Sequence, residues 1–112
     1  MVNNLGDLCI PPDIEQDICT ILHQLCSAFG SNILKIILFG SYAKGSYQPD
    51  SDLDIAVVLK TLPEMRQRAL YTQAVDIDRE VDLIFCTIEQ LESNLYVYKN
   101  VNTEGVVLYE QL

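Results

Sequence analysis

The sequence predicts a small α/β protein, α+β in stricter usage, in which helices flank one mixed β-sheet. The chain has 112 residues, which is enough for a single domain with its own core. Apolar runs of strand length begin at Ile33, Ile55 and Val81, and polar or turn-forming sequence separates them. Helical patterns lie before, between and after these runs, so strands and helices alternate along one compact unit.

The first element is expected to be a core-facing helix that begins at Pro12 and ends before Gly30. Its apolar residues fall on one stripe: Ile14, Ile18, Ile21, Leu22, Leu25 and Phe29. His23 lies opposite that stripe, so the only histidine is expected in solvent rather than in a catalytic site. Residues 1–10 show no clear period. We therefore assign residues 1–11 as a flexible arm and residues 12–112 as the domain.

The segment Ile33–Phe39 is continuously apolar and predicts a buried strand that ends at Gly40. Without a Cβ, Gly40 allows a tight turn and lets a phosphate approach the backbone. Ser41 adds a hydroxyl and a backbone N–H at the expected start of a short helix, and a helix N-terminus attracts anions. This corner is a candidate binding site for a triphosphate.

Three aspartates follow at the strands that come next. Asp52 and Asp54 open the apolar run that ends at Leu59, and strand geometry would point both carboxylates to one face. Close carboxylates repel unless a cation lies between them, and hard oxygen ligands suit Mg²⁺. Asp82 lies inside the third apolar run, Val81–Phe85, where burial without compensation would be costly. Together with the phosphate corner, the three carboxylates favour two-metal phosphoryl or nucleotidyl transfer.

Two capping patterns predict the later helices. Thr61 and Glu64 have capping-box spacing and predict a polar helix to about residue 78, and Thr87 and Gln90 predict a second helix after the third strand. A stripe continues that second helix toward residue 105 through Leu91, Leu95 and Tyr98. Val106–Tyr109 could then form a closing strand. We expect the carboxylates on one face of the sheet and the helices on the other.

Several of the remaining charged and aromatic residues have structural interpretations. Arg66, Arg68 and Arg79 are most simply solvated helix charges, with a nucleotide contact as the alternative. The residues Tyr96, Tyr98 and Tyr109 are expected to pack in the core, with an adenine-stacking wall or an interface patch as the alternative.

The acidic pattern also admits structural readings. Residues 50–52 follow Pro49 and could be ordinary turn residues before a strand, and Asp82 could face solvent at a strand edge. The spacing Gly40-x₄-Gly45 begins like a P-loop, but the Lys and Ser/Thr that must come next are absent. A Gly-x-Gly-x-x-Gly dinucleotide fingerprint is also missing.

The order of these motifs resembles the nucleotidyltransferase superfamily that includes DNA polymerase beta, and in particular its short form, the minimal nucleotidyltransferases. The segments 38–46 and 51–58 match the Gly-Ser, ten-residue, Asp-x-Asp signature without a gap, and the resemblance covers roughly residues 12–110. It implies a nucleotidyltransferase fold. Nucleotide-binding residues would be Gly40, Ser41, Lys44 and Ser51; catalytic residues and ligands of two Mg²⁺ ions would be Asp52, Asp54 and Asp82.

One position departs from the family pattern. Many relatives carry Arg where this chain has Tyr42 or Lys44, so the extra cationic contact with the triphosphate rests on Lys44. In the family, Asp82 would complete the metal site or serve as the general base.

Stand-alone minimal nucleotidyltransferases of this length resemble antitoxins of two-gene modules whose toxin is a HEPN-domain ribonuclease. The resemblance implies transfer of AMP from ATP to a tyrosine hydroxyl of that toxin, which would block its RNA-binding cleft. Two alternatives stay open. The chain could neutralise the toxin by binding alone, or it could modify a small hydroxylated molecule, although related enzymes of that kind use an additional helical domain.

The charge and the cysteine content limit which partners and which compartment can be expected. Seven basic and sixteen acidic residues leave a formal charge of 7 − 16 = −9. This charge disfavours direct nucleic-acid binding and favours a hetero-oligomer with a basic protein such as the toxin. The four cysteines form no C-x-x-C pair, which disfavours zinc or a disulfide framework, and they are expected to be small apolar packing residues in a reducing compartment. No leader or membrane-spanning apolar run is present, so we expect a cytoplasmic protein that does not enter membranes.

Overall fold

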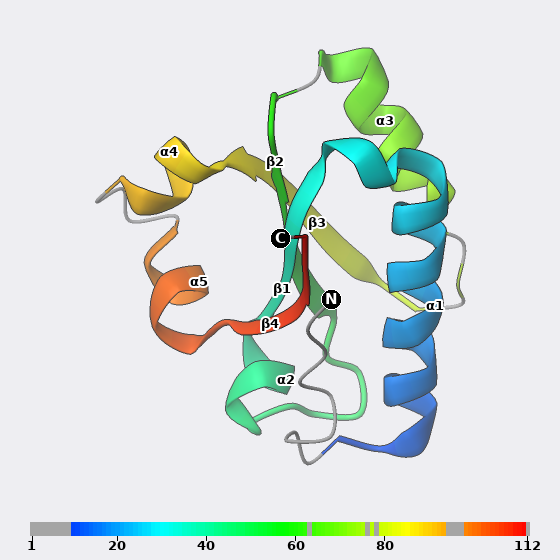
Figure 1. Ribbon diagram of the computed structural model, residues 1–112. Coiled ribbons are helices and arrows are strands. Elements are labelled where there is room, and N and C mark those ends of the chain that lie inside the picture. The colour runs from blue at the N-terminus through cyan, green and yellow to red at the C-terminus, as the bar shows by residue number, and fades with distance from the viewer. Residues whose placement is uncertain (1–9, 63, 76, 78, 94–97, 112) are drawn as a thin grey trace.

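The computed structural model describes residues 10–62, 64–75, 77, 79–93 and 98–111. Within this part of the chain, four strands form one sheet in the order β3-β2-β1-β4 (Figure 1). β1 (Ile33–Phe39) runs antiparallel to β2 (Leu53–Leu59) and to β4 (Val106–Glu110), whereas β3 (Val81–Thr87) runs parallel to β2. The predicted mixed sheet and the closing strand are confirmed.

Helix α1 (Pro12–Phe29) covers one face of the sheet, as its apolar stripe predicts (Figure 1). Four residues of the stripe are buried against the sheet: Ile14, Ile18, Ile21 and Leu25. His23 is exposed, in agreement with the helical spacing. Gly30 keeps right-handed helical angles, with φ −52° and ψ −36°, so α1 ends in the 3₁₀ turn η2 (Gly30–Asn32) and not in a left-handed glycine cap.

Helices also lie on the opposite face, which corrects the expectation that they cover only one. Figure 1 shows α4 (Ile88–Glu92) and α5 (Lys99–Glu104) on the side of the sheet away from α1. The reason lies in β2, which is apolar on both faces. Ile55 packs into the core beneath α1, and its neighbour Ala56 packs into a second core with Leu91 of α4.

The first capping prediction is wrong. Helix α3 spans Met65–Ala74, and its N-cap residue Glu64 makes no side-chain cap hydrogen bond. Thr61 is instead tied to the 3₁₀ turn, because its backbone N donates to Asn32 Oδ1 at 3.2 Å and its carbonyl accepts from Asn32 Nδ2 at 3.2 Å. Thr61 therefore secures the end of β2. Residue 78, the predicted helix end, lies outside the described residues.

The second capping prediction is confirmed. Thr87 Oγ1 accepts from the backbone N of Gln90 at 3.3 Å, and Gln90 Oε1 accepts from the backbone N of Thr87 at 3.1 Å. The helix is shorter than expected, because extended angles at Ser93 (φ −66°, ψ 153°) end it and α5 begins anew at Lys99. Leu95 lies outside the described residues.

The tyrosine prediction holds for two residues. Tyr98 packs against the second core and Tyr109 against the first, and Tyr96 lies outside the described residues. The cysteines described are free thiols: Cys86 and Cys26 pack in the two cores as expected, whereas Cys19 is exposed, which corrects the packing prediction for that residue. Across the described residues, no helix combines the length and apolarity needed to cross a membrane.

Candidate active site

The direction of the strands brings the predicted site residues to one edge of the sheet. β1 ends at Phe39 where the antiparallel β2 begins, and the parallel β3 begins at the same edge. Phe39 pairs with Asp54, and Asp54 pairs directly with Asp82. Helix α2 (Ser41–Lys44) follows β1 at this edge and lies at the lower end of the view in Figure 1. Residues that are up to 42 positions apart in the chain thus meet at one place.

Gly40 has a second role that its sequence context did not reveal. Its angles, φ 78° and ψ −156°, belong to a region that is open almost only to glycine. A Cβ at this position would collide with Oδ2 of Asp54. The absent side chain therefore makes room for the Asp54 carboxylate beside the turn, in addition to allowing the turn itself. The predicted short helix at Ser41 is confirmed, and the backbone N of Lys44 donates to the carbonyl of Gly40 at 3.1 Å.

The environment of Asp54 raises the pKa of its carboxyl group. Partial burial is the main cause, followed by the negative charges of Asp82 and Asp52 and by a side-chain hydrogen bond with Asp82. Asp82 and Asp52 are exposed. Asp52 lies immediately before β2, which begins at Leu53, so of this pair only Asp54 lies within the strand. The structure thus brings Asp54 and Asp82 into contact and leaves Asp52 near enough to act through its charge.

These carboxylates fit a hard cation by their chemistry. Their donors are all oxygens, and the negative charges of Asp82 and Asp52 add to partial burial in raising the pKa of Asp54, an effect that a bound cation would offset. Among the described residues, no three His, Cys, Asp or Glu side chains already converge as a closed metal-binding group. Ligation by Asp52, Asp54 and Asp82 together therefore stays a prediction.

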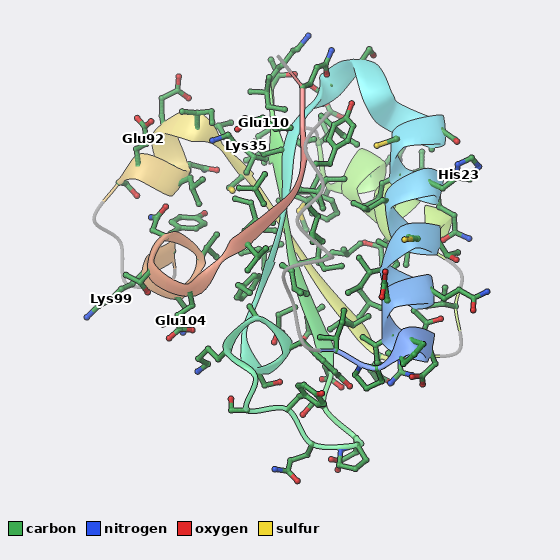
Figure 2. All side chains as sticks on the ribbon, turned by 60° about the horizontal axis from the view of Figure 1, so that its bottom comes forward. His23, Lys35, Glu92, Lys99, Glu104 and Glu110 are labelled. Atoms are coloured by element: carbon green, nitrogen blue, oxygen red, sulfur yellow. The ribbon has the colours of Figure 1, made fainter. Side chains whose placement is uncertain are left out.

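Lys44 is directed toward α5 by an acidic residue that sequence analysis missed. Its Nζ lies 3.6 Å from Oε2 of Glu104, and the two side chains are 47% and 28% exposed. The same Glu104 oxygen is buried and accepts no hydrogen bond, because 3.6 Å is too long for one. Glu104, labelled in Figure 2, is the last residue of α5. Because it contacts Lys44, it is a neighbour of the candidate phosphate corner. Nothing in the local sequence around Glu104 indicates this long-range contact.

Ser51 makes its described contacts within the loop. Its Oγ accepts from the backbone N of Gln48 at 2.7 Å, and its backbone N donates to the carbonyl of Gln48 at 3.0 Å. The residue therefore closes the loop between α2 and β2, and its contact with a nucleotide stays a prediction.

Arg79 is not the solvated helix charge that we expected. It lies after α3 and before β3, with its side chain only 22% exposed. Its Nε donates to Asp17 Oδ2 at 2.9 Å, and its Nη2 lies 3.5 Å from Asp13 Oδ2. The hydrogen bond to Asp17 is the main cause that raises the pKa of Arg79. Arg79 thus ties the start of β3 to α1. Arg66 is exposed as predicted, and the side chain of Arg68 lies outside the described residues.

The comparison with protein families agrees with this arrangement. The family model described as "Polymerase beta, Nucleotidyltransferase" matches residues 21–111. This chain belongs to that nucleotidyltransferase family. The match includes Gly40, Ser41 and all three aspartates, so the predicted nucleotidyltransferase fold is confirmed.

Relatives within the family have informative names. A candidate protein adenylyltransferase of Methanocaldococcus jannaschii is 34% identical over 102 residues, which is 85% of this chain and 97% of the relative. Another from the same organism is 34% identical over 56 residues and matches 50% of each chain, so this similarity spans about half the length of that relative. A solved toxin–antitoxin structure with AMP-PNP has a TM-score of 0.61 and 30% identity, over 81% of this chain and 72% of that chain.

Proposed function

We propose that this protein is an antitoxin that transfers AMP from ATP to a tyrosine hydroxyl of a HEPN-family ribonuclease toxin and thereby neutralises the toxin. The observation that carries the proposal is the register that sets Asp54 opposite Asp82, beside the Gly40–Ser41 corner. The names of the relatives as protein adenylyltransferases and the similarity to a toxin–antitoxin structure with AMP-PNP support it.

The chain's own residues would divide the reaction between them. The backbone at Gly40 and the hydroxyl of Ser41 would hold the phosphates. The three aspartates, Asp52, Asp54 and Asp82, would hold Mg²⁺, which when bound neutralises the triphosphate and the leaving pyrophosphate. The acceptor oxygen forms a bond to the α-phosphorus as the bond to the β-phosphate oxygen breaks. Asp82, the exposed member of the Asp54–Asp82 pair, would accept the acceptor proton.

Charge supports a basic protein as the acceptor. The formal charge of −9 would steer association with the basic surface of a ribonuclease. Attached AMP adds a negative phosphate and a bulky base, which would exclude RNA from a basic cleft by repulsion and by size. Free thiols at Cys19, Cys26 and Cys86, together with ATP as the substrate, support a cytoplasmic setting.

The same charge favours one competing function. An acidic protein could occupy the basic cleft of a toxin without catalysis, with the nucleotide site unused. Neutralisation by binding alone should survive substitution of the aspartates, whereas AMP transfer should not. Modification of a small hydroxylated molecule would be the second competing function.

Intact-mass spectrometry tests the proposal. A toxin encoded beside this chain would be incubated with the chain, ATP and Mg²⁺, and its mass compared before and after. We expect a gain of one or more AMP units that is lost with Asp54→Asn and kept with Glu89→Gln, an exposed carboxylate of α4 outside the site. A tight complex with no mass gain would favour binding alone. A gain found only on a small hydroxylated molecule would overturn the protein acceptor.

A further inference from the structure

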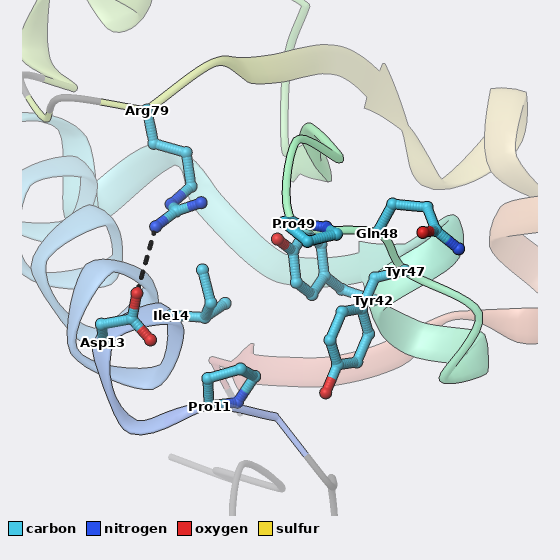
Figure 3. Close-up of a pocket in the computed structure, with 8 residues that line it drawn as sticks. All are labelled: Pro11, Asp13, Ile14, Tyr42, Tyr47, Gln48, Pro49 and Arg79. Atoms are coloured by element: carbon cyan, nitrogen blue, oxygen red, sulfur yellow. Dashed lines mark hydrogen bonds and ion pairs between the residues drawn. The ribbon is translucent and has the colours of Figure 1, made fainter.

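A pocket of about 300 Å³ lies on the side of the sheet that α1 covers. Pro11 and Ile14 at the start of α1 form one wall, and Tyr42, Tyr47 and Pro49 form the other (Figure 3). The tyrosines and Ile14 belong to the core beneath α1. Strand alternation places Asp54 and Asp82 on the opposite face, with the second core. The pocket is therefore separate from the candidate active site.

The aromatic wall of the pocket is already formed. The rings of Tyr42 and Tyr47 stack with their centroids 4.7 Å apart and an interplanar angle of 14°. Tyr42 is buried at 2% exposure, so it supports the ring of Tyr47 from beneath, and Tyr47 is the part of the stack that a ligand can contact. Gly45, with φ +81°, makes the turn that brings Tyr47 back onto Tyr42. A preformed aromatic surface binds without an ordering cost, which is how anchor pockets in protein interfaces work.

The pocket lining holds one acidic residue, Asp13, and one basic residue, Arg79, and Asp17 contacts Arg79 from outside the lining. Figure 3 shows Arg79 reaching toward Asp13 at one side of the pocket. Arg79 pairs with both carboxylates, at 2.9 Å to Asp17 and at 3.5 Å to Asp13, so the three side chains together carry one net negative charge. Asp13 is 72% exposed, so it presents this charge to solvent at the rim. The pocket thus combines apolar aromatic walls with an acidic rim.

We propose that this pocket is a docking site for a basic protein segment, which packs one large apolar or aromatic side chain against Tyr47 and Pro49 and places a neighbouring Lys or Arg against Asp13. The volume, about 300 Å³, lies at the lower limit for a small-molecule site and suits a single anchor side chain. The formal charge of −9 favours a basic partner and disfavours a second copy of this acidic chain.

The position of the pocket makes docking there useful. Tyr42 directly follows Ser41 in the chain, so the wall of the pocket and the candidate phosphate corner share helix α2. A partner anchored at Tyr47, which stacks on Tyr42, would be held next to the transfer site without filling it. This inference rests on the proposed function only for the identity of the partner as a toxin, because the pocket's walls and charges are independent of catalysis.

Tryptophan fluorescence gives a direct test, since the chain contains no tryptophan. The probes would be amidated peptides of sequence Lys-Lys-Trp-Lys-Lys, Glu-Glu-Trp-Glu-Glu and Lys-Lys-Ser-Lys-Lys, the last used as an unlabelled competitor. We expect the Lys/Trp peptide to bind with a Kd on the order of 0.1–1 mM, the range for one anchor with limited ordering cost. The Glu/Trp peptide should not bind, the Ser peptide should compete poorly, and added salt should weaken binding.

Variants assign the binding to the pocket. Tyr47→Ala should weaken binding of the Lys/Trp peptide about tenfold, as expected for loss of an aromatic anchor wall. Asp13→Asn should weaken binding of the Lys/Trp peptide severalfold and reduce the salt dependence of that binding. Because Asp13 is exposed, this variant should still fold, so binding can be measured even if Tyr47→Ala does not fold. Glu89→Gln, on α4, is the matched control and should bind as the unmodified chain does.

Four results would overturn the proposal. These are equal binding of the Glu/Trp and Lys/Trp peptides, full binding by both pocket variants, displacement of the peptide by ATP, and self-association that Tyr47→Ala abolishes. The last two would assign the pocket to a nucleotide or to a second copy of the chain. None of these measurements requires AMP transfer, so failure of the docking site and failure of the proposed reaction are told apart.

Discussion

Asp54 and Asp82 are direct neighbours across the parallel strands β2 and β3, and strand alternation places both carboxylates on the same face of the sheet. This contact exists because β3 starts at the same sheet edge as β2, so two residues separated by a whole helix become direct neighbours. Partial burial raises the pKa of Asp54, and the nearby negative charge of Asp82 raises it further because it disfavours ionisation. A cation at this edge would relieve the repulsion and gain two oxygen ligands.

Replacing Asp54 with Asn should separate catalysis from folding. The change keeps the volume of the side chain and removes its charge. We therefore expect the rate of AMP transfer to fall by about 100-fold or more, which is the usual loss of rate when a group that stabilises charge in the transition state is removed. The melting temperature without divalent ions should rise by a few degrees, because like-charge crowding is relieved. Added Mg²⁺ should stabilise the unmodified chain and not the variant. Unchanged transfer with unchanged metal dependence would remove Asp54 from the site.

Glycine substitutions on either side of α2 should have unequal effects. Gly40→Ala and Gly45→Ala both force an L-residue to positive φ, which costs on the order of 1–3 kcal/mol. Only at Gly40 would the new Cβ also meet the Asp54 carboxylate, whereas Gly45 has open space around it. Urea unfolding should therefore show a larger loss for Gly40→Ala, and only this variant should also lose nucleotide binding. Equal losses in both measurements would rule out the Gly40–Asp54 contact.

Stability without divalent ions should depend on pH through Asp54. A folded-state pKa above the ordinary carboxyl value means that folding favours the protonated form. The contribution of this group is fully present below the unfolded-state pKa and is lost as pH rises through the folded-state pKa. The difference in free energy of unfolding between Asp54→Asn and the unmodified chain should thus grow from about pH 4 upward, where an ordinary Asp ionises. Denaturant titrations across this range measure it, and a pH-independent difference would contradict the assignment.

Glu104 should weaken nucleotide binding by engaging Lys44. Glu104→Gln removes a negative charge near the phosphate corner and frees the Lys44 ammonium, so we expect ATP to bind a few-fold more tightly, the size of one partly exposed ion pair. Glu110→Gln is the matched control, because it breaks a comparable pair with Lys35 at 3.2 Å (Figure 2). Calorimetric titration with ATP compares the two variants. Weaker binding after Glu104→Gln would mean that Glu104 instead positions Lys44 for the phosphates.

Local patterns in the sequence were sufficient for much of the fold. The apolar run before Gly40 gave β1, the stripe after Pro12 gave α1, and the Thr87 capping box was formed as expected. Predictions failed where a distant residue competed with a local signal. Thr61 has helix-capping spacing, yet Asn32, 29 positions earlier, takes its backbone hydrogen bonds. Arg79 is a charged residue of the type that is usually exposed to solvent, yet it forms a hydrogen bond with Asp17, 62 positions away.

The sequence by itself determined which side chains are the candidates for the chemistry. The Gly-Ser turn and the aspartates at 52, 54 and 82 can be identified from residue type and spacing, because each signal is confined to a short segment. Only the tertiary structure decided how these groups meet: Asp54 against Asp82, the Asp54 carboxylate in the space that Gly40 leaves, Lys44 beside Glu104, and the stacked tyrosines facing Ile14. These contacts depend on strand register and helix docking, which arise from the packing of distant segments and leave no periodic trace in the chain.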